Sequence, residues 1–346
     1  MTASRSELVE RVAAQIVSGS WNMEKHDWEK GCAINGLLAT DQQVEEARRL
    51  VDRSVETQTS DGQLSYGSLG STPYGWEADW ATGEYKSYAD PVVPGHGVLE
   101  FYDRTGESFL LEAARKQYEQ LRRIETTEDG GIPISRGTTD LLLDSLYHFC
   151  PFMARYGLLA DDPDAIDEAV KQIEVHADHL YDSYTGLYRQ GWTESPKDSF
   201  KQDTFWSRGV GWLTTAIVDT YQYLPEDHAG REPLAEMLRD LSETLLDYQD
   251  ASGFWHNTLD DDESPLETSG TLMFAYSFRR GLDLGILSDE RFEASAQRAM
   301  DVCDGTVNRD GEVRRVSVVP GGPNSPLGVA LHGQGWYLLA ASCFAD

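Results

Sequence analysis

The sequence predicts an all-α fold, an (α/α)6 barrel of six inner and six outer helices, formed by residues 1–346 as a single domain. Helical segments of two kinds alternate along the chain with a period of roughly fifty to sixty-five residues, which is typical of a repeat built from helix pairs. Alternating runs of Val, Ile and Thr are scarce, which disfavours a large sheet. No linker rich in Pro and Ser divides the chain, so one domain is expected.

The charged segments are expected to form the outer ring. In residues 165–177, for example, apolar side chains recur every three or four positions with acids between them, so one stripe is buried and the opposite face is solvated. Outer helices are predicted at Arg5–Ile16, Gln42–Gln58, Ser108–Leu121, Asp164–Leu180, Glu232–Tyr248 and Glu290–Cys303.

The apolar segments are expected to form the inner ring. They carry apolar side chains nearly all round, as a helix that is buried on both sides does. These segments begin near Gly31, Asp90, Leu141, Ser207, Glu267 and Gly328. Each begins with polar or aromatic residues, and six such starts around one axis predict a single pocket at one end of the barrel.

The loops at that end are rich in aromatic residues and Gly. The chain has nine Trp and sixteen Tyr, and many of them fall in these loops. Aromatic rings beside Asp, His and Arg suit stacking on sugar faces, although the same rings could simply fill gaps at the barrel mouth. The loops are Trp21–Trp28, Gly62–Tyr88, Gly186–Trp206, Ser252–Thr268 and Val318–Leu327.

The chain is strongly acidic, with a formal net charge of −30. This charge argues against nucleic acid and against an anionic membrane as partners. Seven Lys stand against twenty-two Arg, and a diffuse acidic surface poor in Lys is typical of a halophile-like protein whose self-repulsion is screened by salt. The alternative is an ordinary acidic soluble protein.

No apolar run approaches the ~20 residues of a membrane span. The N-terminus lacks the charged-then-apolar pattern of a signal peptide, so a cytoplasmic protein is expected. The four cysteines are scattered and form no CxxC pair, so no zinc site is predicted.

Asp144 lies near the start of the third apolar segment. Leu143, Leu146 and Tyr147 begin an apolar pattern with helical spacing. A carboxyl group that is partly buried at the mouth of such a helix can stay protonated near neutral pH, which makes it a candidate catalyst. The simpler alternative is that Asp144 caps the helix.

Four motifs in this order resemble the unsaturated rhamnogalacturonyl hydrolases, glycoside hydrolase family 105, and their relatives the unsaturated glucuronyl hydrolases of family 88. They are Asp144-Ser-Leu-Tyr-x3-Pro-Phe-x-Ala-Arg-Tyr-Gly, Trp206-Ser-Arg-Gly-Val-Gly-Trp212, Glu267-Thr-Ser-Gly-Thr and His332-Gly-Gln-Gly. The resemblance runs from about Trp21 to the C-terminus. It implies an (α/α)6 barrel, no metal or organic cofactor, and an unsaturated uronyl oligosaccharide, left by a polysaccharide lyase, as substrate.

The resemblance also implies roles for individual residues. Asp144 matches the acid/base, and Asp90 matches the second aspartate, although Asp90 followed by Pro91 could instead cap a helix. Arg208 matches an arginine that binds substrate, because its fork can hold a carboxylate, or it could pair with Glu267.

Further candidates surround these three residues. Arg136 is a weaker alternative for the carboxylate. His332 and His256 are candidate donors to sugar hydroxyls or ordinary loop histidines. Trp206 and Trp212 are expected as wall or stacking residues, with Trp212 favoured as core.

Two positions depart from the family pattern. Family members often carry Trp where this chain has Leu142, and His where it has Gln190. Both positions are expected to touch substrate, so the sugar specificity is open while the barrel and the chemistry are expected to stay.

Two other functions are compatible with the same barrel. A sugar epimerase or isomerase would need paired His bases in the pocket, for which His256 and His332 are the candidates. A non-catalytic carbohydrate-binding protein would bind ligand without turnover.

Overall fold

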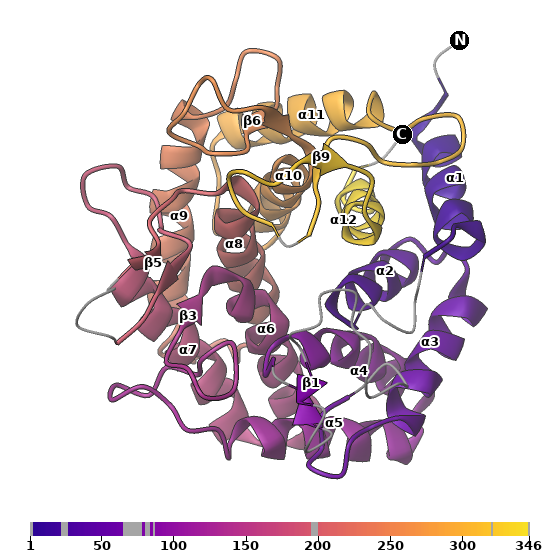
Figure 1. Cartoon of the computed structure of the whole chain (residues 1–346), viewed down its shortest axis with the longest axis vertical. Coiled ribbons are helices and arrows are strands. Elements are labelled where there is room, and N and C mark those ends of the chain that lie inside the picture. Colours follow the sequence, from indigo (N-terminus) through magenta and orange to yellow (C-terminus); the bar gives the residue numbers. More distant parts are fainter. Residues whose placement is uncertain are drawn as a thin grey trace.

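The computed structural model describes residues 3–21, 27–64, 78–79, 84–85, 87–194, 200–319 and 321–344. Within them the chain forms an (α/α)6 barrel of twelve α-helices, as predicted (Figure 1). Helices of the two kinds alternate along the chain, so each inner helix has an outer neighbour in sequence and in space.

Six inner helices surround the barrel axis. Each packs against the next, and the last packs against the first, which closes the ring. They are α2 (Asp27–Ala39), α4 (Val93–Thr105), α6 (Leu143–Ala160), α8 (Ser207–Tyr221), α10 (Thr268–Asp283) and α12 (Leu331–Ala341). A 3-10 turn, η1 (Asp90–Val92), leads into α4, with Pro91 at a helix start that needs no N–H donor.

Six amphipathic helices form the outer ring, each with one buried stripe. They are α1 (Arg5–Ser18), α3 (Val44–Glu56), α5 (Ser108–Leu121), α7 (Pro163–Leu180), α9 (Arg231–Asp247) and α11 (Glu290–Asp304). Local sequence fixes several ends. Ser4 and Glu7 form a capping box at the start of α1, Asp289 caps α11, and Pro163 opens α7.

Short antiparallel strands connect the helices at one end of the barrel. The pairs are β1 (Ala78–Asp79) with β2 (Glu84–Tyr85), β6 (Trp255–His256) with β7 (Leu266–Glu267), and β8 (Val316–Ser317) with β9 (Leu327–Gly328). A three-stranded sheet joins β3 (Leu141–Leu142), β4 (Gly191–Trp192) and β5 (Phe200–Gln202). The sixth inner helix therefore begins at Leu331 rather than near Gly328, because residues 327–328 pair as a strand.

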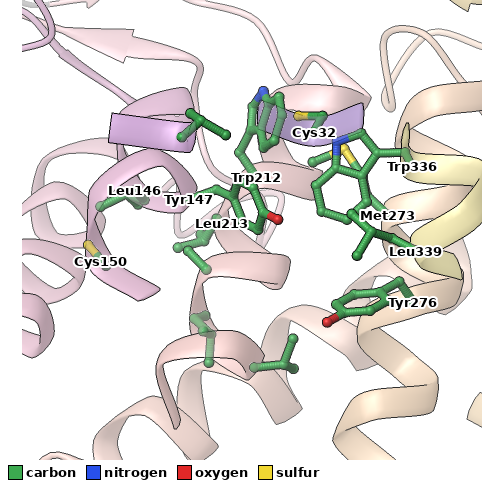
Figure 2. Close-up of a cluster of buried hydrophobic side chains, with 14 of the residues drawn as sticks. Cys32, Leu146, Tyr147, Cys150, Trp212, Leu213, Met273, Tyr276, Trp336 and Leu339 are labelled. Carbon is green, nitrogen blue, oxygen red and sulfur yellow. The ribbon is translucent and has the colours of Figure 1, made fainter. Parts of the chain in front are cut away.

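The barrel axis is filled by aromatic side chains from different inner helices (Figure 2). Tyr147 of α6 lies 5.2 Å from Trp212 of α8 and 5.0 Å from Trp336 of α12, measured between ring centroids. All three side chains are almost completely buried. This aromatic plug separates a cavity at the helix starts from another at the helix ends.

Helices α2 and α12 close the ring through a glycine contact. A Cβ on Gly36 would lie 2.5 Å from the carbonyl oxygen of Gly335, and a Cβ on Gly335 would lie 2.4 Å from that of Cys32. Only glycine lets the two backbones approach this closely.

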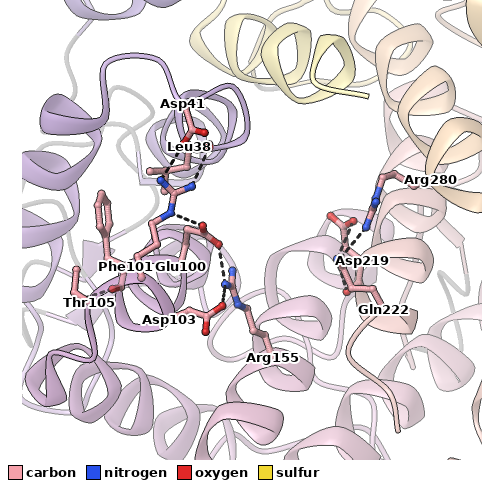
Figure 3. Close-up of polar contacts among 11 residues, drawn as sticks. Leu38, Asp41, Glu100, Phe101, Asp103, Thr105, Arg155, Asp219, Gln222 and Arg280 are labelled. Carbon is pink, nitrogen blue, oxygen red and sulfur yellow. Dashed lines mark hydrogen bonds and ion pairs between the residues drawn. The ribbon is translucent and has the colours of Figure 1, made fainter. Parts of the chain in front are cut away.

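The cavity at the helix ends has a volume of about 370 Å³ and a polar lining. Tyr276 donates a 2.7 Å hydrogen bond to Asp219. Gln222 bridges Asp219 to Arg280 (Figure 3). Burial raises the pKa of Asp219 to about 6, which the Tyr276 hydrogen bond and the Arg280 charge offset only in part.

Replacing Asp219 by Asn is expected to stabilise the fold above pH 6. The raised pKa means that the ionised carboxylate is less stable in the folded chain than in the unfolded one. The gain should therefore grow from about pH 4 to pH 6 and then stay constant, at no more than about 3 kcal/mol. Urea unfolding at several pH values measures it, with the exposed Asp227→Asn as control. A gain that is the same at pH 4 and pH 8 would contradict the shifted titration.

None of the described helices combines the length and hydrophobicity that a bilayer crossing requires.

Candidate active site

A cavity of about 410 Å³ opens at the end of the barrel where the inner helices begin. Six of the residues predicted from the sequence line it, namely Asp90, Leu142, Asp144, Gln190, Trp206 and Arg208. They come from η1, β3, α6, the residue before β4, and the start of α8. Residues far apart in the sequence thus meet at one end of the barrel, as the pattern of helix starts predicted.

Asp144 lies in the first turn of α6 and faces this cavity. Its side chain does not cap the helix; the Nε2 of Gln190 donates to its Oδ2. Gln190 is held there by backbone bonds, since its carbonyl accepts from Leu143 N at 3.2 Å and its N–H donates to Thr204 O at 3.0 Å. Burial raises the pKa of Asp144, and the Gln190 hydrogen bond and the charge of Arg208 oppose that rise.

Asp90 lies at the start of η1 and is 8% exposed. Its backbone N–H donates to the Ser87 hydroxyl at 3.1 Å. Its Oδ1 lies 3.5 Å from Nδ1 of His148. The cavity therefore contains both predicted carboxylates, one at the start of α6 and one on the turn before α4.

Arg208 brings a buried positive charge to the cavity and is 1% exposed. Its Nη1 donates to the Ser317 carbonyl and lies 2.9 Å from His332 Nε2. Its Nε has no hydrogen-bond partner among the described residues. Burial lowers the pKa of Arg208, while nearby Glu267, Asp144 and Glu29 raise it, so the guanidinium remains a cation with an unused donor.

Trp206 forms a wall beside this guanidinium. The Arg208 guanidinium carbon lies 4.3 Å from the Trp206 ring centroid, and the indole N–H donates to Asn257 at 3.0 Å. Gly321 covers both side chains with φ at +89°, and a Cβ there would lie 2.6 Å from the Trp206 ring. The site therefore requires glycine at position 321 on both conformational and steric grounds.

His332 is completely buried behind Arg208 and does not line the cavity. Its Nδ1 lies 2.7 Å from Glu29 Oε1. Because Arg208 can only donate, Nε2 of His332 must accept and Nδ1 must carry the proton that is donated to Glu29. Glu29, His332 and Arg208 thus form a buried chain of hydrogen bonds that holds the guanidinium in position.

Three other candidates lie away from the cavity lining. Trp212 is completely buried in the aromatic plug. His256 bonds the Ser264 carbonyl, within the β6–β7 hairpin and its loop. Arg136 lies 3.5 Å from Asp61 and stacks over Tyr88. None of these three side chains lines the cavity in the part of the chain that the structure describes.

Trp28, at the end of the predicted aromatic loop Trp21–Trp28, lines the cavity, and the titratable lining residues that sequence reasoning missed are Asp140 and His148. His148 follows Asp144 by four positions, which places both on one face of α6. That spacing was the available signal, but His148 lies within an otherwise apolar run.

Parts of the predicted loops lie outside the described residues, namely 22–26, 65–77, 80–83, 86, 195–199 and 320. Among the residues that are described, no cluster of three or more His, Cys, Asp and Glu side chains is placed to hold a metal ion. Two carboxylates, one with a raised pKa, an arginine and aromatic walls in a cavity of this size can bind an anionic sugar and transfer a proton to it.

The chain is similar in sequence to a family of glycosyl hydrolases and to individual members of known activity. Residues 5–344 match the profile described as Glycosyl Hydrolase Family 88. An unsaturated 3S-rhamnoglycuronyl hydrolase from Alteromonas sp. (strain LOR) is 27% identical over 254 residues, which cover 71% of this chain and 62% of that relative. The unsaturated rhamnogalacturonyl hydrolase YesR of Bacillus subtilis (strain 168) is 25% identical over 321 residues, which cover 90% of this chain and 85% of YesR.

The fold is likewise similar to solved structures. A possible member of the GH105 family from Salmonella enterica subsp. enterica serovar Paratyphi A superposes with a TM-score of 0.82 at 22% identity, over 99% of this chain and 94% of that one.

Proposed function

Since this chain belongs to glycosyl hydrolase family 88 through a match over residues 5–344, we propose that it releases a 4,5-unsaturated uronic acid from the non-reducing end of lyase-generated oligosaccharides. It is a glycoside hydrolase, and the resemblance to families 105 and 88 that its motifs predicted is confirmed. The two relatives are named for rhamnoglycuronyl and rhamnogalacturonyl saccharides. We extend that substrate class, rhamnogalacturonan- or ulvan-like, to this chain.

One observation carries the proposal. A single sugar-sized cavity contains Asp144, whose pKa burial raises, together with Asp90 and the cationic Arg208. A raised pKa favours the protonated form of the carboxyl group, which a proton donor requires. The Arg208 Nε, which has no hydrogen-bond partner among the described residues, can donate to the uronate carboxylate.

Asp144 acts first as acid and then as base. Its proton passes to C4 of the C4=C5 double bond, and the cation that forms at C5 is shared with the ring oxygen. Water adds at C5 and returns a proton to Asp144, so one water has added across the double bond. The resulting hemiketal opens, C1 becomes a hemiacetal, and the neighbouring sugar leaves as an alcohol. The negative charge of an ionised Asp90 favours the cation.

We also propose a single domain, a carbohydrate partner and a cytoplasmic location for this chain. Closure of the ring between the first and last inner helices supports one catalytic domain over residues 1–346. The chemistry uses side chains and water. The net charge of −30 supports a partner other than nucleic acid. The four cysteines are free, which supports a cytoplasmic location.

The epimerase alternative finds no support in the cavity. It needs paired His bases, and in the part of the chain that the structure describes His148 alone among the histidines lines the cavity, without His256 or His332. The binding-protein alternative differs from the proposal only in turnover, which the following experiment measures.

The test is the ultraviolet absorbance of the conjugated unsaturated acid in lyase digests of rhamnogalacturonan, ulvan and glycosaminoglycans. Adding the enzyme should remove this absorbance from at least one digest. It should also release the neighbouring saccharide, with a newly freed hydroxyl group, in an equal amount. Unchanged absorbance in every digest would reject the proposal, and ligand binding without turnover would support a binding protein.

Replacing Gln190 by Leu is expected to move the alkaline limb of the kcat/KM pH profile upward by about one unit or more. The amide N–H stabilises ionised Asp144, and hydrogen bonds to charged groups contribute about 1.5–3 kcal/mol. Without that donor the pKa of Asp144 rises further, so the acid form persists to higher pH. Gln172→Leu removes a buried glutamine from α7 and should leave the limb in place. A limb unchanged by Gln190→Leu would show that the contact does not govern Asp144.

A further inference from the structure

The face of α6 that carries Asp144 presents a second polar group to the cavity one turn later. His148 is 2% exposed and lines the cavity. Neither of its ring nitrogens has a hydrogen-bond partner among the described residues. A buried polar group without a partner is costly, so two unmet nitrogens beside a binding cavity point to a functional contact.

Aromatic neighbours fix the orientation of this imidazole. Trp28 stacks on it with ring centroids 6.2 Å apart and planes 21° apart. Trp212 meets it edge-on at 5.3 Å. The ring is therefore held between a cavity wall and the aromatic plug, with little freedom to turn away.

The imidazole of His148 is neutral near neutral pH. Burial, assisted by His96, lowers the pKa of His148 to about 3. A neutral imidazole has one N–H donor and one acceptor nitrogen. His148 can therefore donate a hydrogen bond without adding charge to the cavity.

Asp90 provides an acceptor close to that donor. Its Oδ1 lies 3.5 Å from Nδ1, slightly beyond a hydrogen bond. Catalytic hydrogen bonds are often long in the absence of substrate and shorten when it binds. Among the described residues, His96 of α4 acts on the ring, and Asp140, Asp144 and Arg208 line the same cavity. Glu29 of α2 is turned to His332.

We propose that His148 is a positioning residue that donates its Nδ1 proton to Asp90 and so decides which of the two cavity carboxylates stays ionised. The inference rests on the proposed function and adds to it a residue that distinguishes the two acids. A hydrogen bond donated to a carboxylate favours its ionised form, so the Nδ1–H of His148 favours ionised Asp90. For Asp144, burial favours the protonated form, and the Gln190 hydrogen bond and the Arg208 charge oppose it, so the two carboxylates take different roles.

The experiment compares His148→Leu with His148→Asn, whose side-chain amide can replace the Nδ1 donor. His148→Leu should lower kcat by about tenfold to a hundredfold and move the acid limb of the pH profile upward by about one unit or more. His148→Asn should restore most of both. His176→Leu removes another buried histidine, on α7 outside the cavity, and should leave the acid limb unchanged.

A second readout does not depend on turnover. Protein labelled with carbon-13 at aspartate carboxyl groups gives the titration of Asp90 by NMR, with Asp90→Asn for assignment. Asp90 should titrate at higher pH in His148→Leu than in wild type or His148→Asn. An unchanged Asp90 titration would overturn the inference, as would a His148→Asn variant that behaves like His148→Leu. Absence of turnover in the wild type, with the NMR shift present, would reject the proposed function alone.

Discussion

Asp144→Asn is expected to lower kcat by about 10²- to 10⁴-fold, the usual range for removing a general acid. An amide cannot give a proton to C4 or accept one from water. The Asn oxygen can still accept from Gln190, so the start of α6 should keep its structure. Turnover is followed by the ultraviolet absorbance of the unsaturated acid, and folding by near-ultraviolet circular dichroism.

Asp161→Asn provides the matched control. Asp161 ends the same helix in the left-handed conformation, with φ at 56°, and is exposed. Asn adopts that conformation readily, so activity should be unchanged. Substantial turnover by Asp144→Asn would transfer the role of acid to another carboxylate of the cavity.

Arg208→Lys is expected to raise KM by about tenfold to a hundredfold, with a smaller change in kcat. Lysine retains the charge that compensates buried Glu29 and Glu267, but it loses the planar fork that holds a carboxylate through two hydrogen bonds. Loss of hydrogen bonds to a charged ligand accounts for a change of this size. Steady-state kinetics on the preferred lyase digest measures it.

The control for this variant is Arg231→Lys. Arg231 begins α9 and stacks at 4.0 Å on Tyr221, the last residue of α8, at the opposite end of the barrel. Its replacement should leave KM unchanged. If Arg208→Lys lowers kcat at constant KM, Arg208 stabilises the transition state instead of binding the uronate.

The barrel could be predicted from the sequence because its two kinds of helix differ in hydrophobic pattern. Amphipathic stripes mark the outer helices, and all-round apolar segments mark the inner ones. The first residue of a helix could not be predicted where contacts with other segments determine it. Helix α2 begins at Asp27, four residues before the predicted Gly31, and pairing of β9 delays α12 to Leu331.

Those residues of the candidate site that lie at the starts of inner helices could be predicted from the sequence. Asp90, Asp144 and Arg208 reach the cavity because inner helices point the same way round one axis. His332 also stands at a helix start, yet it turns to Glu29, since the closing contact between α2 and α12 sets its direction. His148 was missed because its value depends on Asp90 and Trp28, which only the folded chain brings to it.

Closure of the ring has a consequence for biosynthesis. The bond between Glu29 and His332 joins residues 303 positions apart, and Arg208 depends on it. A ribosome synthesises Glu29 early and His332 almost last. The chain of contacts from Glu29 through His332 to Arg208 therefore cannot form until nearly all of the protein has been translated. We therefore expect a nascent chain to lack the fully held Arg208, and a proteolytic cut that detaches α12 to remove the His332 contact from the site.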